Sequence, residues 1–220
     1  MPIEPLYLLI AFLPLVAYLL VLGVIRISGR VLVTTGGRDI AALGFAVCGL
    51  VAVGPLELFF PKAAAGVFGG WIWVTLGLFY SLVVTLIALT SRPRLVVYGR
   101  GPEEVTRALL NAAKEMDPDS TTEPDGLQVF LPRSGVRLRA AGHKGIDSAS
   151  IESFEPIISQ KFWDTLLSNL RRHASDLPKP GQRRGGMMVL VAVAIATAAS
   201  WQAIRDPQEI VNAFAKWIFR

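Results

Sequence analysis

"LYLLIAFLPLVAYLLVLGVI", residues 6–25, is an apolar run without a single charged side chain. A helix needs about 20 apolar residues to cross the hydrocarbon core of a bilayer, so this run is long enough for one crossing. Pro14 lies inside the run and should bend the helix, because proline leaves one backbone carbonyl without its helical hydrogen bond. The run therefore predicts a first transmembrane helix.

Three later segments have the same apolar character. They cover residues about 40–60, where Gly54-Pro55 should interrupt the helix, about 69–90, and 185–204. Of the 220 residues, 52% are hydrophobic and only 18% are charged, whereas soluble domains carry about 25% charged residues. We therefore predict a multi-pass α-helical membrane protein with four transmembrane helices, three within residues 1–91 and one at 185–204.

Basic residues indicate the orientation of the chain, because cytoplasmic loops are enriched in Lys and Arg. Four crossings put the first loop and the segment 92–184 on the same side of the membrane. We therefore expect a protein of the inner (plasma) membrane with residues 92–184 in the cytoplasm and both termini on the outer side of this membrane. Tryptophans at predicted membrane interfaces agree with this orientation. The basic residues are Arg26, Arg30, Arg38, Arg92, Arg94, Arg183 and Arg184, and the tryptophans are Trp71, Trp73 and Trp201.

The segment 92–176 has the pattern of a small α+β domain. Its predicted order is β-α-β-β-β-α, which favours a two-layer sandwich with both helices on one face of a mostly antiparallel sheet. Residues 177–184 then form a linker to the fourth apolar segment. Period-two alternation and helical spacing predict strands at 95–98, 127–131, 136–140 and 148–154, and helices from Pro102 to about Met116 and over about 159–173.

The C-terminal residues 205–220 predict one more helix. Asp206 can cap its N-terminus, and Pro207 suits the first helical position. The apolar residues that follow recur on one face, so the helix should be amphipathic. It either lies along the outer membrane surface or packs against the transmembrane helices. The apolar face consists of Ile210, Val211, Phe214, Trp217 and Ile218.

"LVVYGRGPEEV", residues 95–105, resembles a strand followed by a phosphate-binding loop and a helix. A dinucleotide fingerprint needs a third glycine, and a P-loop needs Gly-Lys-Ser/Thr, and both are missing here. Glu103 and Glu104 occupy the first helical turn, where their charges would repel a phosphate. The stretch therefore predicts a strand-to-helix turn without a cofactor.

Catalytic and metal-binding signatures are also missing. The chain has one cysteine, Cys48, and two histidines, too few for a usual structural zinc site. His143 stands in one short loop with Asp147 and Ser148, but no nucleophile elbow accompanies it. We therefore predict no catalytic residue, metal site or cofactor, and we favour a non-catalytic role.

Three features remain as candidates for function. Glu57 is the one acid inside an apolar segment, and it is either a boundary residue beside Lys62 or an intramembrane polar site. Ala192, Ala196 and Ser200 have a four-residue spacing that allows close helix packing, with a protein partner or a second copy.

The third feature is the hairpin's outward face, which presents Phe130, Arg137 and Arg139. These side chains either contact lipid head groups or a partner, or are ordinary solvated residues. No RNA-binding strand motif accompanies them, so nucleic acid is not expected as a partner.

The leading functional hypothesis is an integral membrane protein with a cytoplasmic interaction, scaffolding or regulatory domain. One alternative is a small transporter or channel subunit that uses Glu57 and the interrupted apolar segments. A second alternative is a membrane enzyme for an anionic or lipid substrate. Its site would lie between the domain and the first loop, whose charged residues include Arg26, Arg30 and Arg38.

Overall fold

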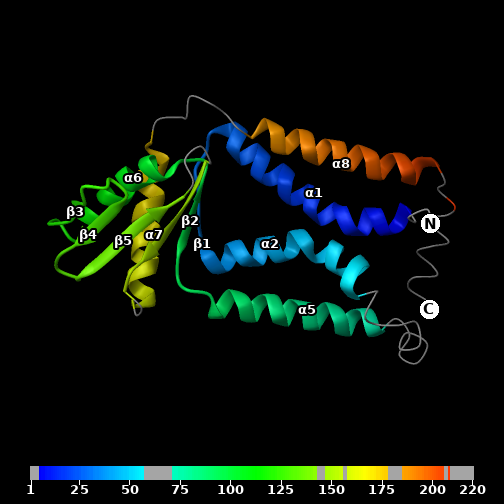
Figure 1. Cartoon of the computed structure of the whole chain (residues 1–220), viewed down its shortest axis with the longest axis horizontal. Coiled ribbons are helices and arrows are strands. Elements are labelled where there is room, and N and C mark those ends of the chain that lie inside the picture. Colours follow the sequence, from blue (N-terminus) through cyan, green and yellow to red (C-terminus); the bar gives the residue numbers. More distant parts are fainter. Residues whose placement is uncertain are drawn as a thin grey trace. The chain divides into compact units, whose positions relative to one another are not determined.

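The computed structural model describes residues 5–56, 71–142, 147–155, 158–177, 185–205 and 208. The chain forms two compact units, and Figure 1 labels their helices and strands. A helical unit consists of Met1–Gly23, Ile40–Thr90 and Met187–Arg220, and a sheet unit consists of Val24–Asp39 and Ser91–Gly186. The sheet unit is therefore assembled from two separate segments of the sequence.

Among the described residues, three helices are long and apolar enough to cross a membrane. These stretches are Leu6–Ser28, Gly36–Gly54 and Trp71–Thr90, and Gly186–Trp201 is a shorter apolar helix. The three long helices agree with the predicted membrane association. The elements themselves are α1 (Pro5–Ser28), α2 (Gly36–Val51), α5 (Trp71–Thr90) and α8 (Gly186–Arg205), with a π-helical turn η1 (Ala52–Leu56) after α2.

The predicted interruption at Gly54-Pro55 is present as this π-helical turn. Proline cannot donate the backbone hydrogen bond that an α-helix requires, so regular helical bonding ends before it. Pro14, by contrast, remains inside α1.

Glycines of α2 allow close packing within the helical unit. A Cβ at Gly49 would clash with the backbone carbonyl oxygen of Ile10 in α1, and one at Gly44 would lie 2.7 Å from Val84 Cγ1 in α5. The Tyr80 hydroxyl of α5 also donates to the carbonyl oxygen of Gly44 at 2.7 Å. Small residues that bring helix backbones together are typical of membrane helices.

The sheet unit contains one six-stranded antiparallel sheet in the order β1-β2-β6-β5-β4-β3. Two helices, α6 (Pro102–Lys114) and α7 (Gln160–Ser175), accompany it. The predicted order β-α-β-β-β-α is found as β2-α6-β4-β5-β6-α7, and β1 and β3 are additions. The strands are β1 (Leu32–Thr35), β2 (Leu95–Tyr98), β3 (Thr121–Thr122), β4 (Gln128–Leu131), β5 (Val136–Ala141) and β6 (Ser148–Ser153).

Strand β1 was not anticipated, because it lies in the loop between α1 and α2. It pairs with β2 from Leu32 opposite Tyr98 to Thr35 opposite Leu95. The close approach of this loop also explains Gly99, which has a φ of +92° and whose Cβ would lie 2.8 Å from the carbonyl oxygen of Arg30. Gly99 of the supposed phosphate loop is therefore required by the close approach of the segment at Arg30.

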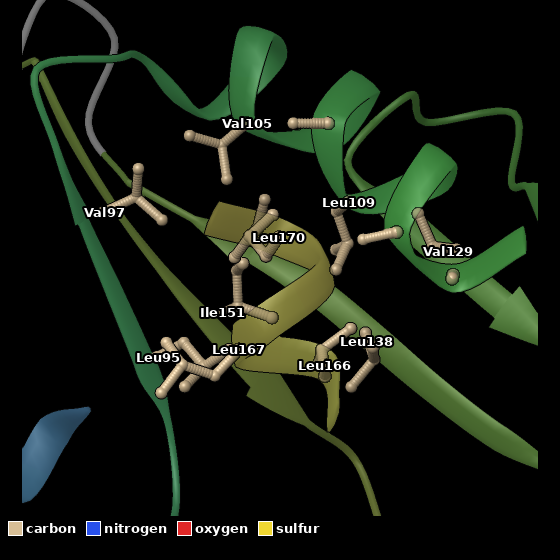
Figure 2. Close-up of a cluster of buried hydrophobic side chains, with 14 of the residues drawn as sticks. Leu95, Val97, Val105, Leu109, Val129, Leu138, Ile151, Leu166, Leu167 and Leu170 are labelled. Carbon is tan, nitrogen blue, oxygen red and sulfur yellow. The ribbon is translucent and has the colours of Figure 1, made fainter. Parts of the chain in front are cut away.

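The core of the sheet unit lies between the sheet and the two helices. Val129, Leu131, Leu138 and Ala140, which the alternation placed inward, are each 0% exposed. Apolar side chains of α6 and α7 pack on this same face, so its side chains are buried. Figure 2 shows Leu95, Val97, Val129, Leu138 and Ile151 from the strands meeting Val105, Leu109, Leu166, Leu167 and Leu170 from the helices.

Candidate functional site

The face of the sheet opposite α6 and α7 is the candidate site, and we call it the uncovered face. Residues directly opposite each other in an antiparallel pair point to the same side. Phe130 of β4 is opposite Arg137 of β5, and Arg139 of β5 is opposite Glu152 of β6. The structure thus brings the predicted residues Phe130, Arg137 and Arg139 together, and it adds Glu152 from a third strand.

An aromatic cluster lies at one end of this face. The guanidinium carbon of Arg137 lies 5.3 Å from the centre of the Phe130 ring, a cation–π distance. A cavity of about 350 Å³ is bounded by both residues together with Phe154 and Glu155. Phe154 is 55% exposed, and it is the one exposed large apolar side chain among the described residues of 91–186. Exposed aromatic side chains next to arginine are enriched at protein interfaces.

Sequence reasoning missed Phe154 as a site residue, although a signal was present. Glu152 points to the uncovered face, so a residue two positions later on an extended chain should point the same way. Extending the period of two beyond the end of β6 would have found Phe154.

Both carboxylates and guanidinium groups lie around this cluster. Arg137 Nε lies 3.6 Å from Glu123 Oε1, and the Arg137 backbone N–H donates to Glu155 Oε2 at 3.0 Å. Arg139 lies opposite Glu152 in the register of β5 and β6. The fourth carboxylate is Asp125. Charges of both signs therefore surround the predicted arginines, since Arg92 and Arg94 line a cavity together with Glu152.

The pKa of Asp125 is lowered from its ordinary value. The largest cause is the hydrogen bond from the Leu127 N–H, with further contributions from the side chain and N–H of Gln128 and from the charge of Arg139, against an opposing effect of burial. These donors favour the charged carboxylate. Asp125 is therefore an acid held in its ionised form next to the uncovered face.

A second cavity, of about 240 Å³, lies where the chain enters α2. It is lined by Asp39, Arg94, Tyr98 and the small residues Ser148 and Ser150, among others. The Tyr98 hydroxyl donates to a carboxylate oxygen of Asp39, which is 8% exposed. The first loop thus contributes a buried acid to the sheet unit. Because small side chains line this part of the sheet, the surface is hollowed there.

Both edges of the sheet are protected. On the β1 edge, the Val33 carbonyl oxygen accepts hydrogen bonds from Arg171 Nε at 3.3 Å and Nη2 at 3.2 Å. On the other edge, β3 is only 2 residues long. Short or occupied edge strands do not readily add a further strand.

Other predicted residues lie elsewhere. Glu57, His143 and the apolar face of the tail helix lie outside the described residues. In α8, Ala192 is 0% exposed and Ser200 is exposed, so the predicted stripe is partly buried within the chain. His173 Nε2 lies 2.8 Å from Glu115 Oε1, which joins the ends of α7 and α6. In the part of the chain that the structure describes, no group of three or more His, Cys, Asp and Glu residues could hold a metal ion.

The opening loop of α6 is filled by its own side chains. Arg100 is 2% exposed and donates from Nη1 to the Gly99 carbonyl oxygen at 2.8 Å. Its Nε lies 3.7 Å from Glu104 Oε2, and Nη2 lies 3.5 Å from the Leu177 carbonyl oxygen. Arg100 therefore ties the start of α6 to the end of the domain, a structural role that agrees with the strand-to-helix interpretation.

Chemically, the uncovered face offers aromatic anchors and charges of both signs. Such a surface can bind another macromolecule through hydrophobic contact and charge complementarity. A search of protein-family models, curated proteins and solved structures found nothing that matches this chain. Its function is therefore inferred from the surface chemistry described above.

Proposed function

We propose that this protein is an integral membrane protein of the inner (plasma) membrane whose sheet unit is a cytoplasmic interaction, scaffolding or regulatory domain. The observation that carries the proposal is the cluster of exposed Phe154 and Arg137 with partly buried Phe130 around one cavity of the uncovered face. Aromatic side chains and arginine are enriched at protein interfaces relative to the rest of a protein surface. No cofactor or catalytic group is required for such a role.

Four crossings are part of this proposal. Helix α8 has 20 residues, and at about 1.5 Å per residue this length spans about 30 Å, the thickness of a hydrocarbon core. Four crossings place both termini outside and residues 92–184 in the cytoplasm. Exposed Arg30, Arg38 and Arg92 near the ends of α1, α2 and α5 support this orientation.

Short connections would keep the domain near the membrane. Strand β1 ends at Thr35 and α2 begins at Gly36, while α5 ends at Thr90 and β2 begins at Leu95. An extended chain advances about 3.3–3.6 Å per residue, so the second connection reaches at most about 18 Å. An interaction domain tethered in this way can hold its partner at the membrane surface.

The edges of the sheet favour docking on the face over strand addition. On one edge, Arg171 already donates hydrogen bonds to the Val33 carbonyl oxygen, and on the other edge strand β3 has only 2 residues. A partner that added a strand would need free backbone groups along an edge. Among the described surfaces of the sheet unit, the uncovered face offers side chains to a partner without the need for a free strand edge.

The alternatives receive less support. A membrane enzyme would use the cavity beside Asp39 and Tyr98, but its volume of about 240 Å³ is below the roughly 300–1,000 Å³ of most ligand pockets. Its nearest polar pair, Ser150 Oγ and Glu152 Oε1 at 3.1 Å, lies on an exposed strand surface. A transporter role for Glu57, contact with anionic lipid and a homo-oligomer through Ala192, Ala196 and Ser200 remain open proposals, and nucleic acid is not proposed as a partner.

Photo-cross-linking tests the proposal. A photoreactive phenylalanine analogue at position 154 of the full chain, in its native membrane, should yield one discrete cross-linked polypeptide that mass spectrometry identifies repeatedly. The same analogue at position 164, exposed on α7, is the matched control, because Asp164 lies on the helical side of the domain. Cross-linking of position 154 to lipid alone, or equal products from both positions, would count against an interaction domain.

A further inference from the structure

The segment that joins α5 to β2 presents two arginines, Arg92 and Arg94, to one cavity of about 250 Å³. Arg92 precedes a proline and is therefore held extended, and side chains two positions apart on an extended segment point to the same side. The two guanidinium groups thus share one side of this short segment. The cavity belongs entirely to the sheet unit and is lined by Ser91, Arg92, Pro93, Arg94, Glu152 and Ser153.

The position of Arg94 is fixed by its neighbours. Its carbonyl oxygen accepts a hydrogen bond from the Gly36 N–H at 2.8 Å. A Cβ at Gly36 would lie 2.6 Å from Arg94 Cγ, so the glycine leaves room for the stem of the arginine. Leu95 is opposite Ile151 in the register of β2 and β6, and the next positions along this register are Arg94 and Glu152. Arg94 is therefore placed by the sheet and by the segment at Gly36.

Both guanidinium groups can accept a ligand. Among the residues that the structure describes, neither the Arg92 nor the Arg94 side chain has a hydrogen-bond or ion-pair partner. Arg137 of the same sheet, by contrast, lies 3.6 Å from Glu123. An arginine fork without a protein partner suits a phosphate, whose oxygens accept two N–H groups at once.

The charged groups around the cavity favour an anion. Glu152 lines the cavity itself, Arg139 lies opposite Glu152 on β5, and Asp39 lines a neighbouring cavity together with Arg94. With Arg92, three arginines therefore stand near two carboxylates. A phosphate fits between Arg92 and Arg94, whereas the ammonium of a zwitterionic head group would approach an excess of arginines.

The place of the cavity along the chain indicates a lipid as the source of the phosphate. Ser91 directly follows Thr90, the last of the 20 residues of α5. A helix of about 20 apolar residues ends at the head groups, where basic residues attract anionic lipids. Because the acyl chains stay in the bilayer, a head group needs less room than the ~300–1,000 Å³ of pockets for drug-sized ligands.

We propose that Arg92 and Arg94 bind the phosphate of an anionic phospholipid head group in this cavity. The inference rests on the proposed membrane location, because α5 must bring the cavity to the level of the head groups, and it goes beyond the proposed interaction role. Glu152 limits the affinity, since its carboxylate lies in the same cavity as the phosphate. The bound lipid attaches the beginning of β2 to the membrane surface.

Native mass spectrometry of the full chain in detergent tests this site. Phosphatidylglycerol and phosphatidylcholine with the same acyl chains are added separately at equal concentrations, and the fraction of protein with one bound lipid is measured. Phosphatidylglycerol should bind at least about fivefold more tightly. Arg92→Gln and Arg94→Gln should each weaken its binding by about tenfold, because each removes charge-assisted contacts with the phosphate.

Arg38→Gln is the matched control, because Arg38 is an exposed arginine in the first turn of α2 that does not line the cavity. It should change the affinity by less than about twofold, since detergent removes the general attraction of a charged bilayer. Glu152→Gln should strengthen the binding of phosphatidylglycerol by about two- to threefold, because it removes a like charge beside the phosphate. A gain of affinity cannot come from misfolding, so this variant keeps the test valid if an arginine variant folds poorly.

Several outcomes would overturn the proposal. They are equal binding of the two lipids, equal weakening by Arg38→Gln and Arg94→Gln, and weaker binding in Glu152→Gln. Full competition by inorganic phosphate at the concentration of the lipid would also overturn it, because the ligand would then be soluble. Each of these results leaves the interaction role intact if position 154 still captures a polypeptide. Lipid selectivity without a cross-linked polypeptide would reject the interaction role and support the lipid site.

Discussion

Arg171 of α7 donates two hydrogen bonds to the Val33 carbonyl oxygen of β1, at 3.3 Å from Nε and 3.2 Å from Nη2. Val33 itself is 4% exposed and belongs to the core of the sheet unit. A strand from the loop between two apolar helices is thereby attached to a domain that lies much later in the sequence. The sheet unit and the first loop are consequently expected to be stabilised together.

Loss of this contact should loosen β1. In Arg171→Ala, the Val33 carbonyl loses two charge-assisted donors, and we expect a local destabilisation of about 1–3 kcal/mol. Hydrogen exchange of the full chain in nanodiscs should show faster exchange in residues 30–36, by about tenfold or more. Arg171→Lys should recover part of the protection, because lysine keeps the charge without the planar fork.

Arg172→Ala is the matched control. Arg172 is also an arginine of α7, but it pairs with Glu115 at 2.9 Å on the exposed side, where an ion pair contributes about 0–1 kcal/mol. Equal effects of the Arg171 and Arg172 substitutions on residues 30–36 would contradict the role assigned to Arg171.

The two glycines that flank Arg100 should respond differently to alanine. Gly99 has a φ of +92°, and its Cβ would lie 2.8 Å from the Arg30 carbonyl oxygen. Gly99→Ala should therefore cost about 1–3 kcal/mol through backbone strain and displacement of β1. Urea unfolding of the full chain in detergent measures this change, with the circular dichroism signal of the β-sheet recorded at each urea concentration.

Gly101 provides the comparison within the same loop. It has an extended conformation with a φ of −76°, and no other atom lies within 4 Å of the place that a Cβ would take there. Gly101→Ala should cost less than about 1 kcal/mol, the usual difference between these residues at a helix N-cap. Similar losses at both glycines would argue against the close approach of Arg30 as the cause.

Much of the sheet unit was predictable from the sequence, because apolar and polar residues alternate strongly in strands that have one buried and one exposed face. Val129 and Leu138 are fully buried, and Arg137 and Arg139 point away, as the alternation requires. Strand β1 was not predictable in this way. Its 4 residues are too few for a reliable period, and its pairing with β2 joins positions far apart in the sequence.

The candidate site was predictable only in part for a related reason. Phe130, Arg137 and Arg139 lie on regular strands, so their common face follows from spacing. Glu123 lies in the connection after β3, where the spacing of residues does not determine direction, and at Glu155 the period of two beyond β6 predicts the opposite face. The contacts of Arg137 with Glu123 and Glu155 therefore became visible only in the structure.

Acid should weaken the turn between β3 and β4 through Asp125. The pKa of Asp125 is below its ordinary value of 3.8 because the Leu127 N–H, and then Gln128 and Arg139, favour the carboxylate. The folded state thus binds fewer protons than the unfolded chain at this site, so its contribution to stability is present above the unfolded pKa. That contribution is lost as the pH falls through the lower folded pKa.

Asp125→Asn should accordingly reduce the difference in urea midpoint between pH 6 and pH 3, measured by circular dichroism in detergent. The variant retains an oxygen acceptor but has no charge to lose. An unchanged difference between the two pH values would show that Asp125 does not contribute to acid sensitivity.

Four crossings make a sharp prediction for labelling in intact cells. With Cys48 replaced by serine, single cysteines at the exposed positions Arg38 and Thr122 should be protected from a membrane-impermeant maleimide until the cells are opened. A cysteine at exposed Gln208, beyond α8, should react in intact cells because the fourth crossing returns the chain to the outside. Protection of all three positions would mean that α8 does not cross, and reaction of positions 38 or 122 from outside would reverse the orientation. Only the predicted pattern leaves the uncovered face accessible to a cytoplasmic partner, so this experiment should precede the cross-linking at position 154.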